Sequence, residues 1–370
     1  MKAETFKILA HGGDHIGPEV VAAGLDVLRH VADIENFNVT IDKDLLGGAS
    51  WDVHNTFCTD AVLEKARSAD ATLVGAVGGP KWDNIRIDGP ITESDGLSRL
   101  RIELDSYNAL RPVRAWDALL DRTPFKPEIV RGTNLLVVRE NAGGIYYGEP
   151  RGREQQQDGQ VRAFEISEYV THEVERIARC AFDMALTRRK KVASLDKSNV
   201  MESGKLWRKT VERIGKEEYP GIELTHLLMD HALYAVSMNP GDFDVLLADN
   251  LFGDLISDMV GAVAGSLGML PSATLSGSAR ANGKIKGGIY EPTHGSAPDI
   301  SGKGIANPIG TILSVGMMCE LAFGRPDINR RLENSVETIL HNGVLTHDLG
   351  GNASTVSVTK EICNAYKSYC

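Results

Sequence analysis

Cysteine is scarce in this sequence and never occurs in a closely spaced pair. The five cysteines are Cys58, Cys180, Cys319, Cys363 and Cys370, and no CxxC occurs among them. An odd count with wide spacing is not typical of a disulfide framework or of a zinc site. We therefore expect reduced thiols in a cytosol-like compartment.

Long apolar runs, a targeting signal and an excess of basic residues are also missing. No uninterrupted apolar stretch is long enough to cross a bilayer, and the N-terminus, MKAETFKILAHGG, has neither the apolar region of a signal peptide nor an Arg-rich presequence. The formal net charge is -10, which argues against a nucleic-acid or membrane partner held by bulk electrostatics. We expect a cytoplasmic protein that binds any anionic ligand through locally concentrated positive charge.

What remains is the composition of an ordinary globular protein, with 42% hydrophobic and 24% charged residues. A chain of 370 residues is long for one domain, so two domains with substantial cores are expected.

The first third of the chain alternates between short apolar strands and amphipathic helices. Strands are predicted at residues 6–10, 38–42 and 71–77, and helices at 18–33 and 59–70. Pro18 favours the start of the first helix, and Thr59 is a candidate N-cap of the second. This βαβαβ order predicts a largely parallel sheet with helices on both faces.

The middle of the chain is interrupted by a polar stretch, YGEPRGREQQQDGQ, at residues 147–160. The stretch has two interpretations, a disordered loop or an arm that pairs with another subunit. Strands alternate with helices on either side of this stretch and through the rest of the middle of the chain. The last hundred residues are expected to hold Gly-rich loops and two or three helices. The predicted strands are 134–141, 161–167, 191–196, 223–229 and 243–249. The predicted helices are 167–189, 205–219, one between the last two strands, and a segment starting near 250.

The turn after the first strand, HGGDHIGPEV, lacks the Rossmann pattern G-x-G-x-x-G. Only Gly12, Gly13 and Gly17 are present. A lone Gly-rich turn is weak evidence for a nucleotide, and the alternative is simply a tight turn.

Three arginines near the middle of the chain are candidates for binding carboxylates. Arg101, Arg111 and Arg139 would suit a dicarboxylate or tricarboxylate substrate if they clustered, because guanidinium groups bind carboxylates in a bidentate manner. Taken separately, Arg101 and Arg111 are better explained as surface or ion-paired arginines. Arg139 is the exception, because it ends an apolar run, and strand ends are where ligands bind in open α/β sheets.

Three aspartates form a candidate metal site. Asp254 and Asp258 are four residues apart, a spacing that places them on one face of a helix, and Asp230 follows a predicted strand. Carboxylate oxygens suit Mg2+ or Mn2+, and a bound cation would offset their repulsion. A solvated acidic helix face is the alternative. Lys197 and Tyr146, both in loops, are candidate groups for moving protons.

Seven motifs occur in order over nearly the whole chain: GAVGGPKWDN, LRIELDSYNALRPV, VRENAGGIYYGEPRG, LDKSNVM, DNLFGDLISD, GSLGMLPSA and YEPTHGSAPDISGKGIANP. Together they resemble the isocitrate/isopropylmalate family of β-decarboxylating dehydrogenases. The resemblance implies an α/β fold of two domains that share a sheet and lack the standard Rossmann fingerprint. It assigns residues 1–106 and 265–370 to an NAD-binding domain, and 107–264 to a domain with metal and substrate residues and a homodimer interface.

The resemblance also implies NAD-dependent oxidative decarboxylation of a 3-substituted (2R)-malate, with isopropylmalate of leucine biosynthesis as the first choice. Lys197, reaching from the partner subunit, would take the hydroxyl proton, and Tyr146 would protonate the enolate after CO2 is lost. Mg2+ or Mn2+ would be held by Asp254 and Asp258 of one subunit and Asp230 of the other. The implied substrate-binding residues are Arg101, Arg111, Arg139, Asp230, Leu97 and Val200.

NAD is expected to bind in loops, chiefly residues 295–307. Asp299 and Ile300 match an NAD-preferring pattern, because a carboxylate accepts hydrogen bonds from ribose hydroxyls and repels a 2′-phosphate. The implied cofactor-binding residues are Ile16, Gly78, Gly79, Glu291, His294, Gly295, Ser296, Ala297, Asp299, Ile300 and Asn307.

The sequence departs from the family pattern at four positions. His15 replaces a turn glycine, Ser94 stands at a usual glutamate, Ser98 at a usual leucine of the isopropyl pocket, and Asn141 at a usual leucine. A smaller or more polar substituent is therefore an alternative, as in D-malate, tartrate or homoisocitrate-type dehydrogenases. A non-catalytic regulatory subunit is a further alternative, but such subunits lose an arginine, the tyrosine or a metal ligand, and all are present here.

Overall fold

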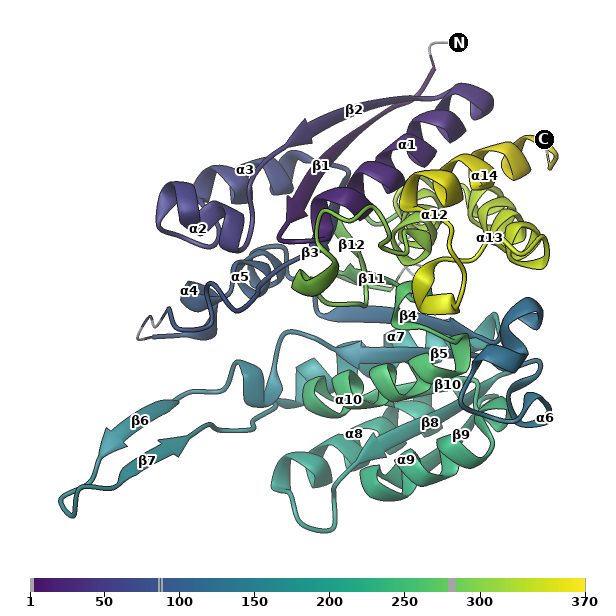
Figure 1. Ribbon diagram of the computed structural model, residues 1–370. Helices are drawn as coiled ribbons and strands as arrows, with labels where there is room; N and C mark the ends of the chain where they lie inside the picture. Colours follow the sequence, from purple (N-terminus) through teal and green to yellow (C-terminus); the bar gives the residue numbers. More distant parts are fainter. Residues whose placement is uncertain (1–2, 86, 88, 279–283, 370) are drawn as a thin grey trace.

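A single ten-stranded mixed sheet runs through the whole molecule (Figure 1). The structure is a computed structural model that describes residues 3–85, 87, 89–278 and 284–369. In order across the sheet, the strands are β2 (Asn38–Lys43), β1 (Thr5–Gly13), β3 (Ala71–Ala76), β12 (Gly288–Pro292), β11 (Pro271–Leu275), β4 (Asn108–Arg114), β5 (Asn134–Glu140), β10 (Val245–Ala248), β8 (Lys191–Asp196) and β9 (Glu223–Leu228). The predicted α/β class is confirmed.

Helices cover both faces of the sheet around β1, because successive strand residues point to opposite faces. Ile8 and Ala10 belong to the main core with the helices on one face, whereas Leu9 packs with α3 and α5 on the other. The helices of this half are α1 (Gly17–Glu35), α12 (Ile309–Leu321), α13 (Pro326–His341) and α14 (Thr355–Lys367) on the first face, and α2 (Gly48–His54), α3 (Asp60–Ser68), α4 (Ile91–Ser94) and α5 (Gly96–Glu103) toward the second. Thr59 caps α3 as predicted, accepting from the Val62 N–H at 3.3 Å.

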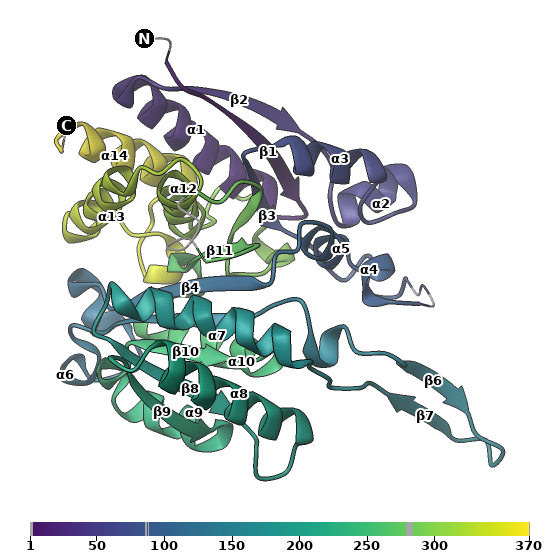
Figure 2. The same ribbon diagram turned by 180° about the vertical axis from the view of Figure 1, so that it is seen from behind.

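The other half of the sheet is covered in the same way. Helices α9 (Met229–Met238) and α10 (Asn250–Gly261) lie on the face seen in Figure 1, and α7 (Thr171–Leu186) and α8 (Glu202–Glu218) lie on the face seen from behind in Figure 2. The remaining short helices are α6 (Pro127–Val130), η1 (Asp117–Arg122), η2 (Gly144–Tyr146), η3 (Pro240–Asp242), η4 (Ala262–Ala264), η5 (Leu267–Met269), η6 (Pro298–Ile300) and η7 (His347–Leu349). No helix in the described ranges combines the length and apolarity needed to cross a membrane.

Antiparallel pairs join the two halves at the centre of the sheet. β11 pairs antiparallel with both β12 and β4, and β4 pairs antiparallel with β5, whereas the six outer pairings are parallel. This arrangement fits one sheet shared by two domains. The domain limits at 106/107 and 264/265 stay a prediction.

The predicted helix over 167–189 is shorter in the structure. It begins at Thr171, because the Glu173 side chain accepts from the Val170 N–H at 2.9 Å and fixes the helix start there. It ends at Leu186, and Lys190 soon after adopts a left-handed conformation with φ 60°.

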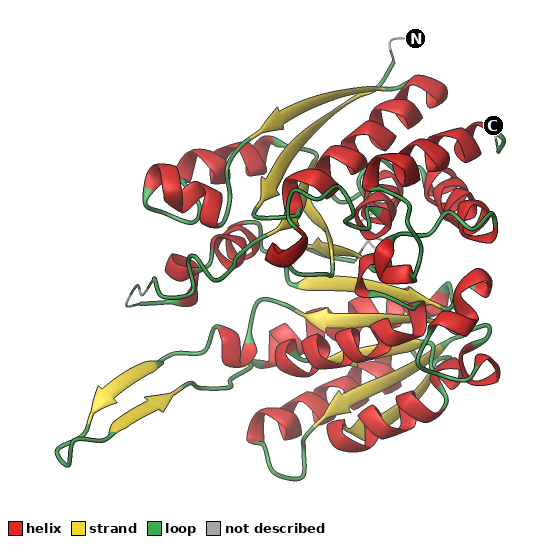
Figure 3. Cartoon of the chain, in the orientation of Figure 1, coloured by secondary structure: helices red, strands yellow, loops and turns green. Residues whose placement is uncertain are grey.

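The polar stretch 147–160 forms part of an arm. β6 (Gly152–Gln155) and β7 (Val161–Phe164) pair as an antiparallel ribbon that projects away from the body of the molecule (Figure 3). Nearly all of its residues are exposed. Of the two interpretations of this stretch, the structure shows the extended arm.

Candidate active site

Three arginines from three elements converge on one pocket of ≈ 350 Å³. Arg111 on β4 and Arg139 on β5 point to the same face of the sheet, because Arg111 lies opposite Val137 and Arg139 lies opposite Ala109. Arg101 reaches the pocket from α5. The lining residues are Ile91, Asp95, Ser98, Arg101, Arg111, Arg139, Asn141, Tyr146, Tyr147, Arg151 and Asp254.

The start of helix α10 holds Arg139 in place. The Asn250 side-chain oxygen accepts from Arg139 Nε at 3.0 Å and from Nη2 at 2.7 Å. Gly253 lets the arginine lie against the helix, since a Cβ there would come within 2.6 Å of Arg139 Cγ. The guanidinium is therefore buried and fixed in orientation.

Arginines offset the repulsion between Asp254 and Asp258. Asp254 pairs with Arg139 and lies 3.4 Å from Arg111 Nη1, and Asp258 lies 3.9 Å from the same atom. Burial favours a higher pKa for Asp254, but the charges of Arg139 and Arg111 outweigh it and the pKa is lowered. Burial raises the pKa of Asp258, and Arg111 only partly opposes this.

The arginines themselves lack full compensation. Burial, reinforced by the charge of Arg139, lowers the pKa of Arg111 to about 10. Arg101 is the exception, because Glu291, at 2.7 Å, overcomes the effect of burial and raises its pKa. The Nε atoms of Arg101 and Arg111 are buried without a hydrogen-bond partner among the described residues. A ligand with two carboxylates would satisfy these donors.

Tyr146 is positioned to donate a proton into the pocket. Its hydroxyl donates to Asp254 Oδ2 at 3.1 Å, and its ring lies 5.8 Å from the Arg139 guanidinium. Burial, together with the Asp254 charge, raises the pKa of the phenol, which keeps it protonated at neutral pH. Gly144 has φ 71° in the turn before it, where a Cβ would lie 2.4 Å from the Tyr169 hydroxyl.

Lys197 and Asp230 form a separate pair. Lys197 follows β8, Asp230 lies in the first turn of α9, and the two side chains are joined by an ion pair. Neither lines the arginine pocket, and nearby Val200 is 69% exposed. Within the part of the chain that the structure describes, no group of three possible ligands could hold a metal ion. One chain alone therefore does not bring the three predicted metal ligands together.

Leu97 also lies apart from the arginine pocket. It is buried in the core cluster with Leu9, Val74 and Leu100, while Ser98, one residue on, lines the pocket. Its predicted contact with substrate stays a prediction.

A second cavity, of ≈ 460 Å³, gathers many of the predicted cofactor residues. The predicted residues that line it are Ile16, His294, Gly295, Ala297, Ile300 and Asn307. Ser296 lies beside it, its carbonyl accepting from the Ile16 N–H at 3.1 Å, and Asp299 is exposed on η6. Glu291, by contrast, faces Arg101.

His294 offers an acceptor to this second cavity. Burial lowers its pKa, which favours the neutral ring, although the Gly295 carbonyl partly opposes this. Nδ1 lies 2.9 Å from that carbonyl, which assigns the proton to Nδ1. Nε2 is buried without a partner among the described residues, and in this tautomer it is an acceptor.

Sequence reasoning missed part of the wall of the second cavity. The missed residues are Ser266, Leu267, Gly268, His347 and Asp348, while Ile305 falls within the predicted loop 295–307. Asp348 accepts from Asn307 Nδ2 at 3.0 Å and from the Ser266 hydroxyl, so it links η7 to η5. The motif GSLGML could have pointed to Ser266 and Gly268, whereas nothing in the sequence around Asp348 marks it.

The Gly-rich turn after β1 is held by one carboxylate. Asp14 accepts from the N–H groups of Gly48, Ala49 and Gly78 at 2.7–2.9 Å. His15, which stands where the family usually has glycine, takes a left-handed conformation with φ 51°. The turn therefore forms despite the substitution. Gly79, another predicted cofactor residue, lies beside the His15 ring.

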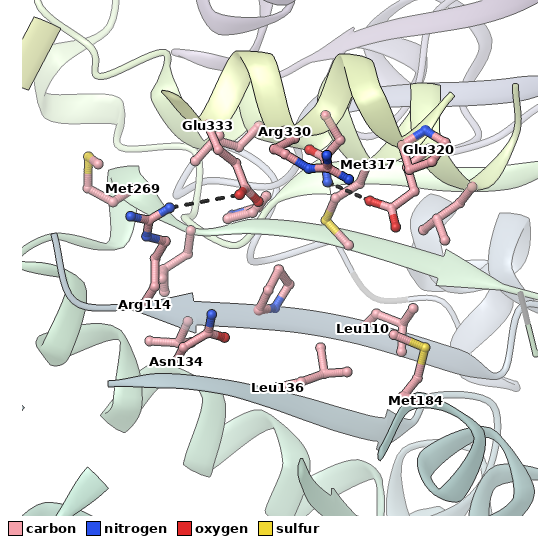
Figure 4. Close-up of a pocket in the computed structure, with 18 of the residues that line it drawn as sticks. Leu110, Arg114, Asn134, Leu136, Met184, Met269, Met317, Glu320, Arg330 and Glu333 are labelled. Carbon is pink, nitrogen blue, oxygen red and sulfur yellow. Dashed lines mark hydrogen bonds and ion pairs between the residues drawn. The ribbon is translucent and has the colours of Figure 1, made fainter. Parts of the chain in front are cut away.

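A third cavity, of ≈ 350 Å³, lies on the opposite face of the central strands (Figure 4). Leu110, Pro112 and Arg114 of β4 point into it, whereas Arg111 points to the arginine pocket. Arg114 bridges to α13 through Glu337 at 2.7 Å and Glu333 at 3.8 Å. This cavity is separate from the candidate site.

The chain matches the family described as Isocitrate/isopropylmalate dehydrogenase over residues 7–365. It is 44% identical over 359 residues to a 3-isopropylmalate dehydrogenase of Pseudomonas fluorescens, covering 97% of both chains. It is 45% identical over 347 residues to that of Ruegeria pomeroyi, covering 94% of this chain and 93% of the other. Among solved structures, it is similar to an isocitrate dehydrogenase from Methylococcus capsulatus, with TM-score 0.83, 31% identity and coverage of 98% of this chain and 99% of that chain.

Proposed function

This chain belongs to the isocitrate/isopropylmalate dehydrogenase family, and from that premise we propose that it is an NAD-dependent oxidative decarboxylase of (2R,3S)-3-isopropylmalate. The products are 4-methyl-2-oxopentanoate and CO2, as in leucine biosynthesis. The observation that carries the proposal is the buried set of three arginines facing Tyr146 and Asp254 in one pocket. Arg101, Arg111 and Arg139 bind the substrate carboxylates.

Two residues carry out the proton transfers of the proposed reaction. Tyr146, kept protonated by its surroundings, delivers a proton to the carbon that loses CO2. Lys197 of the partner subunit takes the proton of the substrate hydroxyl. The Asp254 carboxylate, which accepts from the Tyr146 hydroxyl, orients the phenol toward the arginines.

The acidic residues suit a hard divalent cation. Asp254 and Asp258 lie one turn apart on α10, and their side chains are 38% and 60% exposed, so their oxygens are available for coordination. Asp230 of the partner subunit supplies the third carboxylate. These carboxylates would hold Mg2+ or Mn2+, which would supply a Lewis acid for the substrate hydroxyl and the carbonyl formed from it.

The proposal includes a homodimer with shared active sites. Two observations support it. Lys197 and Asp230 form an exposed pair that lines no arginine pocket of its own chain, and the β6–β7 arm projects away from the body with its strand edges unpaired (Figure 2).

The second cavity suits the adenosine part of NAD. Ile16 and Ile300 offer apolar surface to the adenine ring, and His294 Nε2 offers an acceptor to its amino group. NAD held there would supply the hydride acceptor for oxidation of the substrate hydroxyl.

A turnover assay tests the proposed function. The protein, incubated with (2R,3S)-3-isopropylmalate, NAD and Mg2+ or Mn2+, should reduce NAD and release one CO2 for each NADH formed. Omission of the substrate is the control. Substrate and cofactor binding without any NADH would instead support the alternative of a non-catalytic subunit.

Asp299 should make the enzyme prefer NAD to NADP. The exposed carboxylate accepts from the ribose hydroxyls, and in NADP one hydroxyl becomes a phosphate dianion, so a preference on the order of a hundredfold or more in kcat/KM is expected. The double variant Asp299→Lys with Ile300→Tyr should narrow or reverse it.

The matched control is Asp33→Lys, which makes the same charge change at an exposed position on α1. It should keep the wild-type preference. Equal kcat/KM for NAD and NADP in the wild type would contradict the placement of the ribose at η6.

A further inference from the structure

One wall of the arginine pocket is free of the residues that bind carboxylates or move protons. It is built by Ile91 of α4, by Asp95 and Ser98 at the start of α5, and by Tyr147. The arginines take the carboxylates of a malate, and Tyr146 and Asp254 face the reacting carbons. We place the substituent on C3 of the malate against this wall, because it is the larger part of the remaining lining, the other two residues being Asn141 and Arg151.

The wall is mostly polar. Of its four side chains only Ile91 is aliphatic. Ser98 stands where the family pattern usually has a leucine, and the neighbouring Leu97 is turned away into the core. An isopropyl group would lose apolar contact on this side.

Ser98 and Asp95 of the wall are joined by hydrogen bonds. The Ser98 hydroxyl donates to Asp95 Oδ2 at 2.8 Å, and the Tyr147 side chain lines the same wall. Asp95 Oδ1 accepts from the N–H groups of Leu97 and Ser98 at 2.9 and 3.3 Å. Because a carboxylate has about four acceptor sites, Asp95 keeps capacity for one more donor.

The charge of the wall selects against one group of substrates. Asp95 places a carboxylate beside the position of the substituent. A substituent that ends in a carboxylate, as in isocitrate or homoisocitrate, would be repelled. A neutral substituent that donates a hydrogen bond would be attracted.

We propose that this wall makes the enzyme selective for 3-substituted malates whose substituent carries a hydroxyl group. The inference rests on the proposed reaction, NAD-dependent oxidative decarboxylation of a 3-substituted malate at this site, and it replaces isopropylmalate by a hydroxylated relative as the preferred substrate. The hydroxyl donates to Asp95 and accepts from the Tyr147 hydroxyl, because the one proton of the Ser98 hydroxyl is already donated to Asp95. A site built for hydrogen bonds discriminates strongly against an analogue without the polar group, because its own polar groups then stay unpaired.

A matched pair of substrates tests the proposal. In 3-(1-hydroxyethyl)malate one methyl of 3-isopropylmalate is replaced by hydroxyl, so the two differ little in size. With NAD and Mg2+, kcat/KM should be about tenfold or more higher for the hydroxylated substrate. D-malate and homoisocitrate should both have a lower kcat/KM than the hydroxylated substrate. A preference for isopropylmalate, D-malate or homoisocitrate would overturn the proposal.

Variants assign the selectivity to the wall. Ser98→Leu should lower kcat/KM for the hydroxylated substrate and raise it for isopropylmalate. Asp95→Thr should raise kcat/KM for homoisocitrate. Glu64→Gln, an exposed acid on nearby α3, is the control and should leave all ratios unchanged. Equal changes for both substrates in Ser98→Leu would count against the inference.

The failures of the two proposals are distinguishable. If isopropylmalate is oxidised with NAD faster than the hydroxylated analogue, only the inference about the wall fails. If the wild type oxidises neither substrate, the proposed function fails and the inference fails with it. The substrate pair is compared on the wild type, so this decision does not depend on the folding of any variant.

Discussion

Tyr146→Phe is expected to bind substrate and NAD but to turn over roughly 10²–10⁴-fold more slowly, the usual effect of a lost general acid. The phenol hydroxyl is the pocket group with both a raised pKa and a contact to Asp254, at 3.1 Å. Removing the oxygen leaves the arginine contacts intact, so kcat should fall far more than KM rises. Steady-state kinetics with isopropylmalate and NAD measures both.

Tyr369→Phe is the matched control, because this tyrosine lies near the C-terminus, where its hydroxyl is hydrogen-bonded to Thr338 and Asn334 of α13. It should behave as the wild type. Lys197→Met should impair an earlier step than Tyr146→Phe does, the oxidation of the substrate hydroxyl. The variant should still decarboxylate a 2-keto-3-carboxylate intermediate that is supplied to it. If Tyr146→Phe kept the wild-type kcat, the assignment of the general acid would be wrong.

Removal of the divalent cation should abolish activity, and Mg2+ or Mn2+ should restore it. Asp254→Asn should lower kcat/KM by about two orders of magnitude or more, because it weakens coordination and also removes the counter-charge of Arg139. A chelator titration followed by metal addition measures the first effect. Stabilisation of the folded protein by Mn2+, followed as Tm, measures binding without turnover.

Asp249→Asn is the control for this carboxylate. Asp249 caps α10 by accepting from the Phe252 N–H at 2.8 Å, and asparagine caps helices equally well. It should therefore retain most activity and the Mn2+ stabilisation. Full activity of the wild type in metal-free buffer would refute the metal assignment.

Local patterns predicted the outer strands and their helices well. The alternation of apolar runs and amphipathic segments predicted α1, β2, α3 and β3 to within two residues, because their periodicity agrees with the packing, whereas β1 extends three residues further, to Gly13, than predicted. The central strands β4, β11 and β12 were missed. β4 carries Pro112, and β11 and β12 are short and buried with a proline at one end, Pro271 and Pro292, so neither periodicity nor composition marks these segments as strands.

The candidate site could be predicted only in part, for a related reason. Nothing local brings Arg111 and Arg139 to one pocket, because their meeting depends on the register of β4 against β5. The family resemblance assigned the individual site residues, which periodicity could not do. It did not supply Asp348, which enters the second cavity from a loop near the C-terminus, nor the ion pairs by which Arg111 and Arg139 neutralise Asp254.

The central sheet is completed late in synthesis. One continuous stretch of the chain supplies strands β4, β5, β8, β9 and β10. In contrast, β3 can pair with its inner neighbour β12 only after β12 has been synthesised. At 5–20 residues per second, the interval between Ala76 and Gly288 lasts about 10–40 s. During that time the β1–β3 segment has an unpaired edge on the growing chain. The N-terminal strands are therefore the part of a nascent chain most exposed to wrong partners.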